Sequence, residues 1–424
     1  MTRTMSPEGL DASDETPVVI GPREQLFHLL AEASEIEHTL MCSYLFAAFS
    51  LKSPRTAGLS SVEADAVRRW RKTIMDVATE EMSHLLRVAN LSVAVGGRPH
   101  FARPNFPVAP GYFPSGVVVR LARFSLDTLQ HFIYLERPRG APHRDGAGFE
   151  HEQAYRREEA FHGLMPSVQD YATVGELYEA LRQNLIAMAR RAGEPALLIG
   201  PRAAQVDADV VDLQGVCSIG RLDEALRAID DIVEQGEGAP GDREDSHYRR
   251  FVAIRHEYHA LLAQNPAFEP AWPVAESPVM RRPPEADGKV FVECPEAARV
   301  LDFANAIYSV LLRGLVQGFG RQGTASVAEQ KRYLGIAIEL MHCLSRAATV
   351  LVTMPASPHH PGATAGMTFT MLRSVEPFLQ GTAERILMRE RLAELRDGAR
   401  SLRRAAPDLV ELAPRFEKLL RELD

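Results

Sequence analysis

The stretch WRKTIMDVATEEMSHLLRVANLSVAV (residues 70–95) decides the fold class, because its apolar residues recur at steps of three and four. This spacing predicts one long helix with a continuous apolar face. An acid and an imidazole, Glu81 and His84, occupy the same face. The apolar members of the face are Trp70, Ile74, Val77, Val88, Leu91 and Val95.

The helical period extends over most of the chain, and alternating, strand-like stretches are few. The pattern therefore predicts an all-α protein, with an N-terminal four-helix bundle and a second, C-terminal helical region. The segments with helical spacing are 23–52, 61–96, 126–136, 172–191, 221–236, 244–263, 295–320, 326–353 and 383–422.

Proline-rich breaks divide the chain into four parts. Residues 1–22 carry several acids and no apolar run, so we expect a mobile tail. Residues 23–264 form the expected metal-binding bundle, and 265–289, which contain six prolines, form a linker. Residues 290–424 form the C-terminal helical region.

Composition excludes several classes of function. The chain has 424 residues, a net charge of −8 and a sequence pI near 6.0. A mildly acidic protein is poorly suited to nucleic acid or to an anionic membrane surface. No signal peptide is recognisable, and no apolar run reaches the roughly 20 residues of a membrane span. Four scattered cysteines are typical of a reduced, cytoplasmic protein.

A Glu and a His three residues apart share one helix face and can bind one metal ion. Because this spacing occurs five times, it is weak evidence until the surrounding face is considered. Only two of the pairs lie on an apolar face, where a metal in a bundle core would need them. These two are Glu81/His84 and Glu244/His247, and the others are Glu35/His38, Glu159/His162 and Glu339/His342.

The first helix carries a further acid, Glu37, on an otherwise non-acidic face that also contains Tyr44. An unpaired carboxylate there would cost several kcal/mol. A single buried Glu is more often paired with Arg, and a single buried His is more often hydrogen-bonded than metal-bound. Three such faces in one bundle favour a metal centre.

Dinuclear carboxylate bundles use one Glu from each of two helices and one Glu-x-x-His pair from each of two others. The second single Glu is open among three candidates. Glu176 fits a helix-capping box equally well. Glu136 completes an apolar face, but Arg137-Pro138 ends its helix at once, and Glu237 lies at a helix end close to His247.

Several further residues are candidates to surround such a centre. Tyr44 and Phe251 are candidates to line a substrate pocket. Asp76 or Asp230 are candidates to accept from the outer ring nitrogens of the histidines. The long aromatic segment 96–114 is a candidate roof that excludes water.

Several segments together resemble a known family. They are EIEHTLMCSYLFAAFSL (35–51), EEMSHLLRVANLSVAVGGRP (80–99), FIYLERP (132–138), TVGELYEAL (173–181), IVEQGEG (232–238) and EDSHYRRF (244–251). They are similar to the ferritin-like domain of the iminophenylpyruvate dimer synthase type, which includes an enzyme of violacein biosynthesis.

The resemblance implies a ferritin-like four-helix core with a non-haem di-iron site. It supports Glu37, Glu81, His84 and His247 as ligands, with Glu244 completing the second pair. It also favours Glu176 as the remaining ligand, while Glu237 stays open.

The predicted function is that of a di-iron, oxygen-activating oxidase or oxygenase of natural-product biosynthesis. Its substrate would be a small molecule, such as an aromatic amino acid or its imine. It would bind two iron ions, with manganese as a competitor, and use dioxygen as co-substrate. An external electron donor and a homo-oligomer are further expectations. The alternatives are a ferritin-type ferroxidase that handles iron and a metal-free helical interaction module.

Overall fold

The computed structural model confirms an all-α protein, in which the described strands are a single short parallel pair, β1 (Pro278–Val279) and β2 (Val290–Phe291). The residues it describes are 18–53, 56, 58–109, 111–114, 117–141, 144–149, 165–236, 245–285, 288–319, 326–373 and 381–423.

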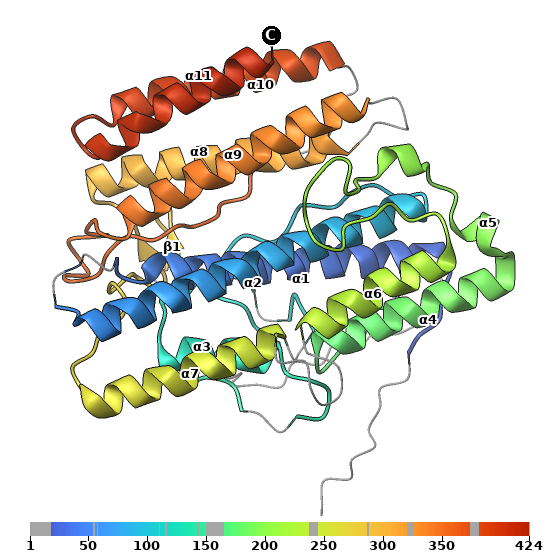
Figure 1. The fold of residues 1–424 in the computed structure, drawn as a ribbon, viewed down its shortest axis with the longest axis horizontal. Helices are drawn as coiled ribbons and strands as arrows, with labels where there is room; N and C mark the ends of the chain where they lie inside the picture. The colour runs from blue at the N-terminus through green and yellow to red at the C-terminus, as the bar shows by residue number, and fades with distance from the viewer. Residues whose placement is uncertain are drawn as a thin grey trace, which may run out of the picture.

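Two long antiparallel helices, α1 (Arg23–Ser50) and α2 (Ser61–Ala94), form the centre of the molecule (Figure 1). A capping box at Ser60 and Glu63 starts α2, because each side chain accepts a hydrogen bond from the other residue's backbone N–H. α1 is buried on nearly all of its faces, which explains why its apolar residues do not form a single narrow stripe.

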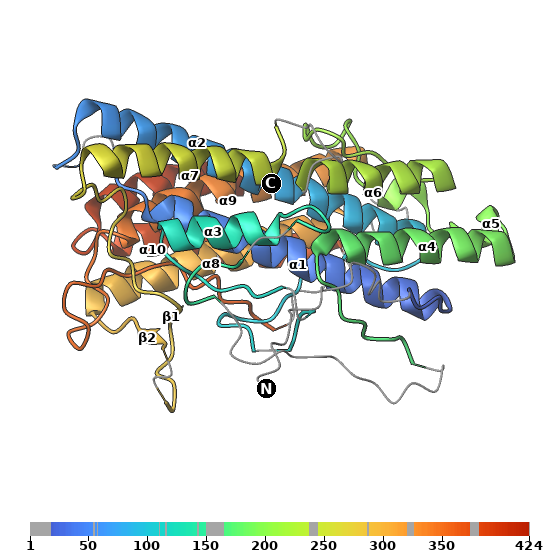
Figure 2. The same cartoon turned by 90° about the horizontal axis from the view of Figure 1, so that it is seen from below.

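The other two helices of the bundle are each broken in the middle. α3 (Leu126–Leu135) and α4 (Val174–Ala192) lie nearly in line, as do α6 (Leu222–Gly236) and α7 (His247–Gln264) (Figure 2). α3 packs on α7 and α4 packs on α6, and α1 and α2 complete the bundle. The breaks therefore place four helix ends in the middle of the bundle.

The C-terminal helices form two further layers on the other side of α1 and α2 (Figure 1). α8 (Pro295–Gly318) and α9 (Val327–Leu351) pack tightly together, and α9 contacts α1. α10 (Gly381–Ser401) and α11 (Ala413–Glu422) cover α8. Shorter turns are α5 (Glu194–Leu197) and the 3₁₀ helices η1 (Arg202–Ala204) and η2 (Pro407–Leu412).

The segments around the bundle are held by hydrogen bonds. Of the predicted tail, residues 1–17 lie outside the described residues, whereas the N–H groups of Val19 and Gly21 donate to the side chains of Gln169 and Asn184. In the linker, the backbone N–H of Trp272 donates to a carbonyl at the end of α1 at 2.7 Å. The division of the chain into domains stays a prediction.

One described helix, α9, is long and apolar enough to cross a membrane by length and composition alone. Half of its most apolar window is buried against the rest of the protein. Charged residues such as Glu339 and Arg346 interrupt this helix, so its sequence contains no unbroken apolar run of that length.

Trp70 anchors the contact between α2 and α7. Its ring lies 5.5 Å from that of Phe124 and 5.2 Å from that of Tyr258, and its Nε1 donates to Glu257 at 2.7 Å.

We expect Trp70→Ala to lower the free energy of unfolding by about 3–5 kcal/mol, because it leaves a large cavity. Urea denaturation measures this loss. Val62→Ala, at an exposed position of the same helix, is the control, and equal stabilities for the two variants would contradict the prediction.

Candidate metal centre

The helix breaks bring five acidic and imidazole side chains together inside the bundle. α1 supplies Glu37, α2 supplies Glu81 and His84, the C-terminal end of α3 supplies Glu136, and the first residue of α7 is His247. All five are buried, with exposed fractions of 6% or less. Charged groups are rarely buried unless something compensates them.

Glu81 lies at the middle of the group, with one carboxylate oxygen toward each imidazole. Its Oε2 is 3.1 Å from Nδ1 of His84, and its Oε1 is 3.0 Å from Nδ1 of His247. Glu37 is 3.4 Å from Nδ1 of His84, and Glu136 is 3.6 Å from Nδ1 of His247. The group thus consists of two sets of three potential ligands that share Glu81.

Each of the outer carboxylates accepts a hydrogen bond from a buried tyrosine. The hydroxyl of Tyr178 on α4 donates to Glu37, and that of Tyr44 on α1 donates to Glu136. The two halves of the site are therefore built alike, with one carboxylate, one imidazole and one phenol each. These hydroxyls hold one oxygen of each carboxylate and leave the other directed at an imidazole.

The outer ring nitrogens of the histidines have different partners. Nε2 of His84 lies 3.0 Å from the amide oxygen of Gln235, and Nε2 of His247 lies 2.9 Å from the carboxylate of Glu80. Glu80 in turn accepts from Arg250 at 2.9 Å.

The two aspartates predicted for this role lie elsewhere. Asp76 pairs with Lys72 and Asp230 pairs with Arg182. Neither is therefore the partner of an outer ring nitrogen in this structure.

The donor set fits a metal ion. The Gln235 and Glu80 oxygens accept from Nε2, so a neutral imidazole has its Nδ1 lone pair toward the carboxylates. The Nδ1 lone pairs of the histidines would then face the lone pairs of the carboxylate oxygens, unless a cation or a proton lies between them. Among the described residues, the buried Nδ1 of His247 makes no hydrogen bond. The nearby Arg87 donates to backbone carbonyls of residues 214 and 215 instead.

When the site holds no metal, bound protons offset the negative charge of its buried carboxylates. Burial and the charge of Glu81 raise the pKa of Glu37 to about 8. Burial lowers the pKa of His84, but the carboxylates of Glu81 and Glu37 outweigh it and raise this pKa to about 9. Burial also lowers the pKa of His247, but the carboxylates of Glu81 and Glu136 outweigh it and raise this pKa well above its usual value. The metal-free site therefore binds protons that a metal ion must displace.

A small cavity of about 20 Å³ lies among Glu37, Glu81, His84 and Glu136. This is room for about one water molecule or ion. A Cβ atom at Gly236, the last residue of α6, would lie 3.1 Å from a carboxylate oxygen of Glu136, so the missing side chain leaves space at this point.

The structure brings Glu136 into the site and leaves Glu176 outside it. Glu176 accepts from the backbone N–H of Ala172 at 2.8 Å and lies 3.7 Å from Arg139, at the start of α4. Its own N–H donates to the Thr173 side chain, but its carboxylate accepts from Ala172 and not from the N–H of Thr173, so the predicted capping box is only half formed. The break at Arg137-Pro138 had made Glu136 hard to assign from sequence, yet that break ends α3 at the site.

Two further candidates, Glu237 and Glu244, lie outside the described residues. Of the predicted Glu244/His247 pair the structure describes His247 alone, as the first residue of α7, with Ser246 as its N-cap.

The predicted pocket residues, Tyr44 and Phe251, lie beside the site. Their rings are 5.2 Å apart, and both contact Phe132, which forms an apolar cluster next to Glu136. The proposed roof, residues 96–114, contributes nothing to the described lining of the small cavity. Phe101 of that segment instead contacts Phe319, the C-cap residue of α8.

A helical bundle whose interior holds carboxylates and histidines in two sets with a shared Glu has the architecture of dinuclear carboxylate proteins. A family model described as ferritin-like matches residues 30–256. The chain belongs to the ferritin-like family.

The chain is similar in sequence to two enzymes. It is 30% identical over 387 residues to dichlorochromopyrrolate synthase of Lentzea aerocolonigenes, which covers 83% of this chain and 36% of that protein. It is 25% identical over 379 residues to 2-imino-3-(indol-3-yl)propanoate dimerase of Chromobacterium violaceum, which covers 82% of this chain and 34% of that protein. The chain thus spans about a third of the length of these relatives.

Among solved structures, the fold is similar to that of a ferritin-like protein from Caulobacter vibrioides. The TM-score is 0.47 at 19% identity, and the match covers 82% of this chain and 99% of that one.

Substitution of the acids tests the ligand assignment. We expect Glu136→Gln to lose about half of the bound metal, because an amide is a poor ligand, and Glu81→Gln to lose nearly all of it, because Glu81 faces both halves. Elemental analysis of purified protein measures the content. Glu176→Gln is the matched control and should leave it unchanged. Metal loss in Glu176→Gln but not in Glu136→Gln would reverse the assignment.

The affinity for metal should fall as the pH is lowered. His84, with a pKa of about 9, and Glu37, with a pKa of about 8, are protonated below these values in the metal-free protein. Each proton that the metal displaces lowers the affinity about tenfold per pH unit below the pKa of that group. Competition titrations with Mn(II) between pH 6 and pH 9 measure this slope. An affinity that does not change with pH would show that the site carries no such protons.

Proposed function

We propose that the centre holds two iron ions and that the protein is an oxygen-activating oxidase or oxygenase of natural-product biosynthesis. The observation that carries the proposal is Glu81, whose two buried oxygens each face the Nδ1 atom of a different histidine. Carboxylate and imidazole ligands suit iron, with manganese as a competitor. Glu37 and His84 would hold one ion, Glu136 and His247 the other, and Glu81 both.

Iron bound here would supply redox chemistry with dioxygen as co-substrate. The protein's own residues prepare the site for it. Tyr178 and Tyr44 orient the outer carboxylates, and Gln235 and Glu80 orient the imidazoles. The rings of Tyr44, Phe132 and Phe251 exclude water from the Glu136 side, which strengthens electrostatic interactions inside the site.

For the substrate, we propose an aromatic amino acid or its imine. This rests on the names of the two similar enzymes, one of which dimerises 2-imino-3-(indol-3-yl)propanoate. The cavity at the ligands, with about 20 Å³, has no room for such a molecule, so the substrate would react from a position next to it. An external electron donor, assembly into a homo-oligomer and a cytoplasmic location remain predictions.

Anaerobic loading with Fe(II), followed by exposure to oxygen, tests the proposal. We expect about two irons per chain and a coupled di-ferric signal in Mössbauer spectra after oxygen is added. Glu81→Gln should abolish both, and Glu176→Gln should retain both.

Other outcomes identify the alternatives. Uptake of many irons per chain into a large assembly would replace the proposal with iron storage. Thermal stability that responds neither to chelators nor to added Fe(II) would instead indicate a metal-free interaction module.

A further inference from the structure

A second cavity, of about 330 Å³, lies on the opposite side of α1 and α2 from the metal centre, facing α8 and α9. Neighbouring residues on each helix serve the two sites separately. On α1, Glu37 faces the metal centre and His38 lines the cavity. On α2, Glu81 faces the metal centre and Met82 lines the cavity. The cavity is therefore separate from the metal site.

The walls of this cavity are mainly apolar and adaptable. They include Met41, Met75, Met82 and Met341, and methionine is flexible enough to fit ligands of different shape. Protein cores rarely leave voids larger than a water molecule. An apolar cavity of about 150 Å³ can hold benzene. A cavity of about 330 Å³ therefore has room for two fused rings with substituents.

The cavity reaches the surface at one end. Its lining includes the exposed residues Thr79, Asp212 and His342, and the side chain of Ile338 on α9, which is 41% exposed. A small molecule can therefore enter between α2, residues 211–213 and α9.

The inner end of the cavity presents a polar group whose hydrogen bonds can be assigned. Nδ1 of His38 lies 2.9 Å from the carbonyl oxygen of Phe101. Because a carbonyl only accepts, this nitrogen carries the proton and Nε2 accepts. The Tyr308 hydroxyl, 2.5 Å away, donates to that Nε2. The Tyr308 oxygen accepts from Arg103 at 3.0 Å, and its remaining contact is the thiol of Cys42 at 3.7 Å.

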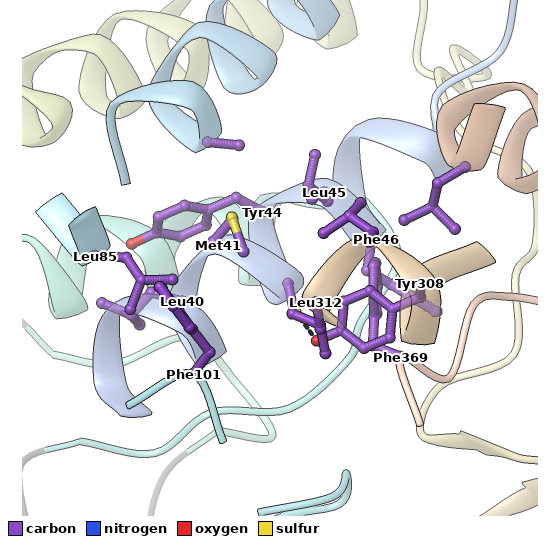
Figure 3. Close-up of a cluster of buried hydrophobic side chains, with 14 of the residues drawn as sticks. Leu40, Met41, Tyr44, Leu45, Phe46, Leu85, Phe101, Tyr308, Leu312 and Phe369 are labelled. Carbon is purple, nitrogen blue, oxygen red and sulfur yellow. Dashed lines mark hydrogen bonds between the residues drawn. The ribbon is translucent and has the colours of Figure 1, made fainter. Parts of the chain in front are cut away.

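Arg103 brings a positive charge to this end of the cavity. It is buried, it donates to the carbonyl oxygens of Pro104 and Phe369, and no carboxylate of the described residues forms an ion pair with it. A cationic ligand would therefore be repelled here. Figure 3 shows Tyr308 and Phe369, whose ring centroids are 5.5 Å apart, with the ring of Tyr44 directed away from them.

We propose that this cavity is a binding site for a neutral bicyclic aromatic molecule whose N–H or O–H group donates to the Tyr308 oxygen. The donor would replace the weak thiol contact of Cys42, and the rings would lie among the methionines and leucines. The site is independent of the function proposed for the metal centre, because no residue is shared between them.

Calorimetric titration of the full chain with indole and with benzofuran tests the proposal. Both compounds have two fused rings, but only indole has an N–H group. We expect saturable binding of both, with indole binding roughly two- to tenfold more tightly, as one net hydrogen bond allows. Tyr308→Phe should remove this preference and leave benzofuran binding unchanged. Failure of indole to bind up to its solubility limit would overturn the proposal.

A variant at the opening of the cavity locates the binding site. We expect Ile338→Trp to weaken the binding of both compounds at least tenfold, because its side chain would block the entrance. Val327→Trp, at another exposed position of α9, is the matched control and should bind both normally. Equal binding by these two variants would place the compounds elsewhere and refute the proposal. This comparison decides the question alone if Tyr308→Phe does not fold.

Discussion

The contact on which the structure depends is that between Glu81 and the two imidazoles of His84 and His247. A buried carboxylate is unfavourable unless cations or hydrogen-bond donors compensate it. Here each of its oxygens faces one Nδ1 atom, and the outer carboxylates of Glu37 and Glu136 complete the two halves. The surrounding bundle must therefore hold several helices at fixed positions, and a change at Glu81 affects both halves at once.

The breaks in the bundle helices follow from this requirement. In an unbroken helix, the direction of each side chain is fixed by the helical period. At a helix end the backbone changes direction, and a side chain there can point toward the site. Glu136 is the C-cap of α3 and α7 begins at His247, so two helix ends meet at the carboxylates. Local structure and chemistry are thus linked, because the residues that stop the helices lie next to the residues that would bind metal.

The central helices α1 and α2 serve two sites at the same time. One face of the pair carries the metal ligands, and the other lines the large apolar cavity against α8 and α9. This arrangement explains why α1 is buried all round and why the C-terminal helices pack against it. It also separates a charged environment from an apolar one by the thickness of a single layer of helices.

The sequence by itself determined the helical fold class and the inward direction of Glu37, Glu81 and His84, because three- and four-residue spacing on long helices defines a buried face. It did not determine which further carboxylate joins them. Glu136 and Glu176 both lie near helix ends, where periodicity no longer reports direction, and only the packing of α3 against α7 brings Glu136 to His247. The partners Gln235 and Glu80 and the Tyr308 cavity likewise depend on contacts between residues distant in sequence, which local spacing does not encode.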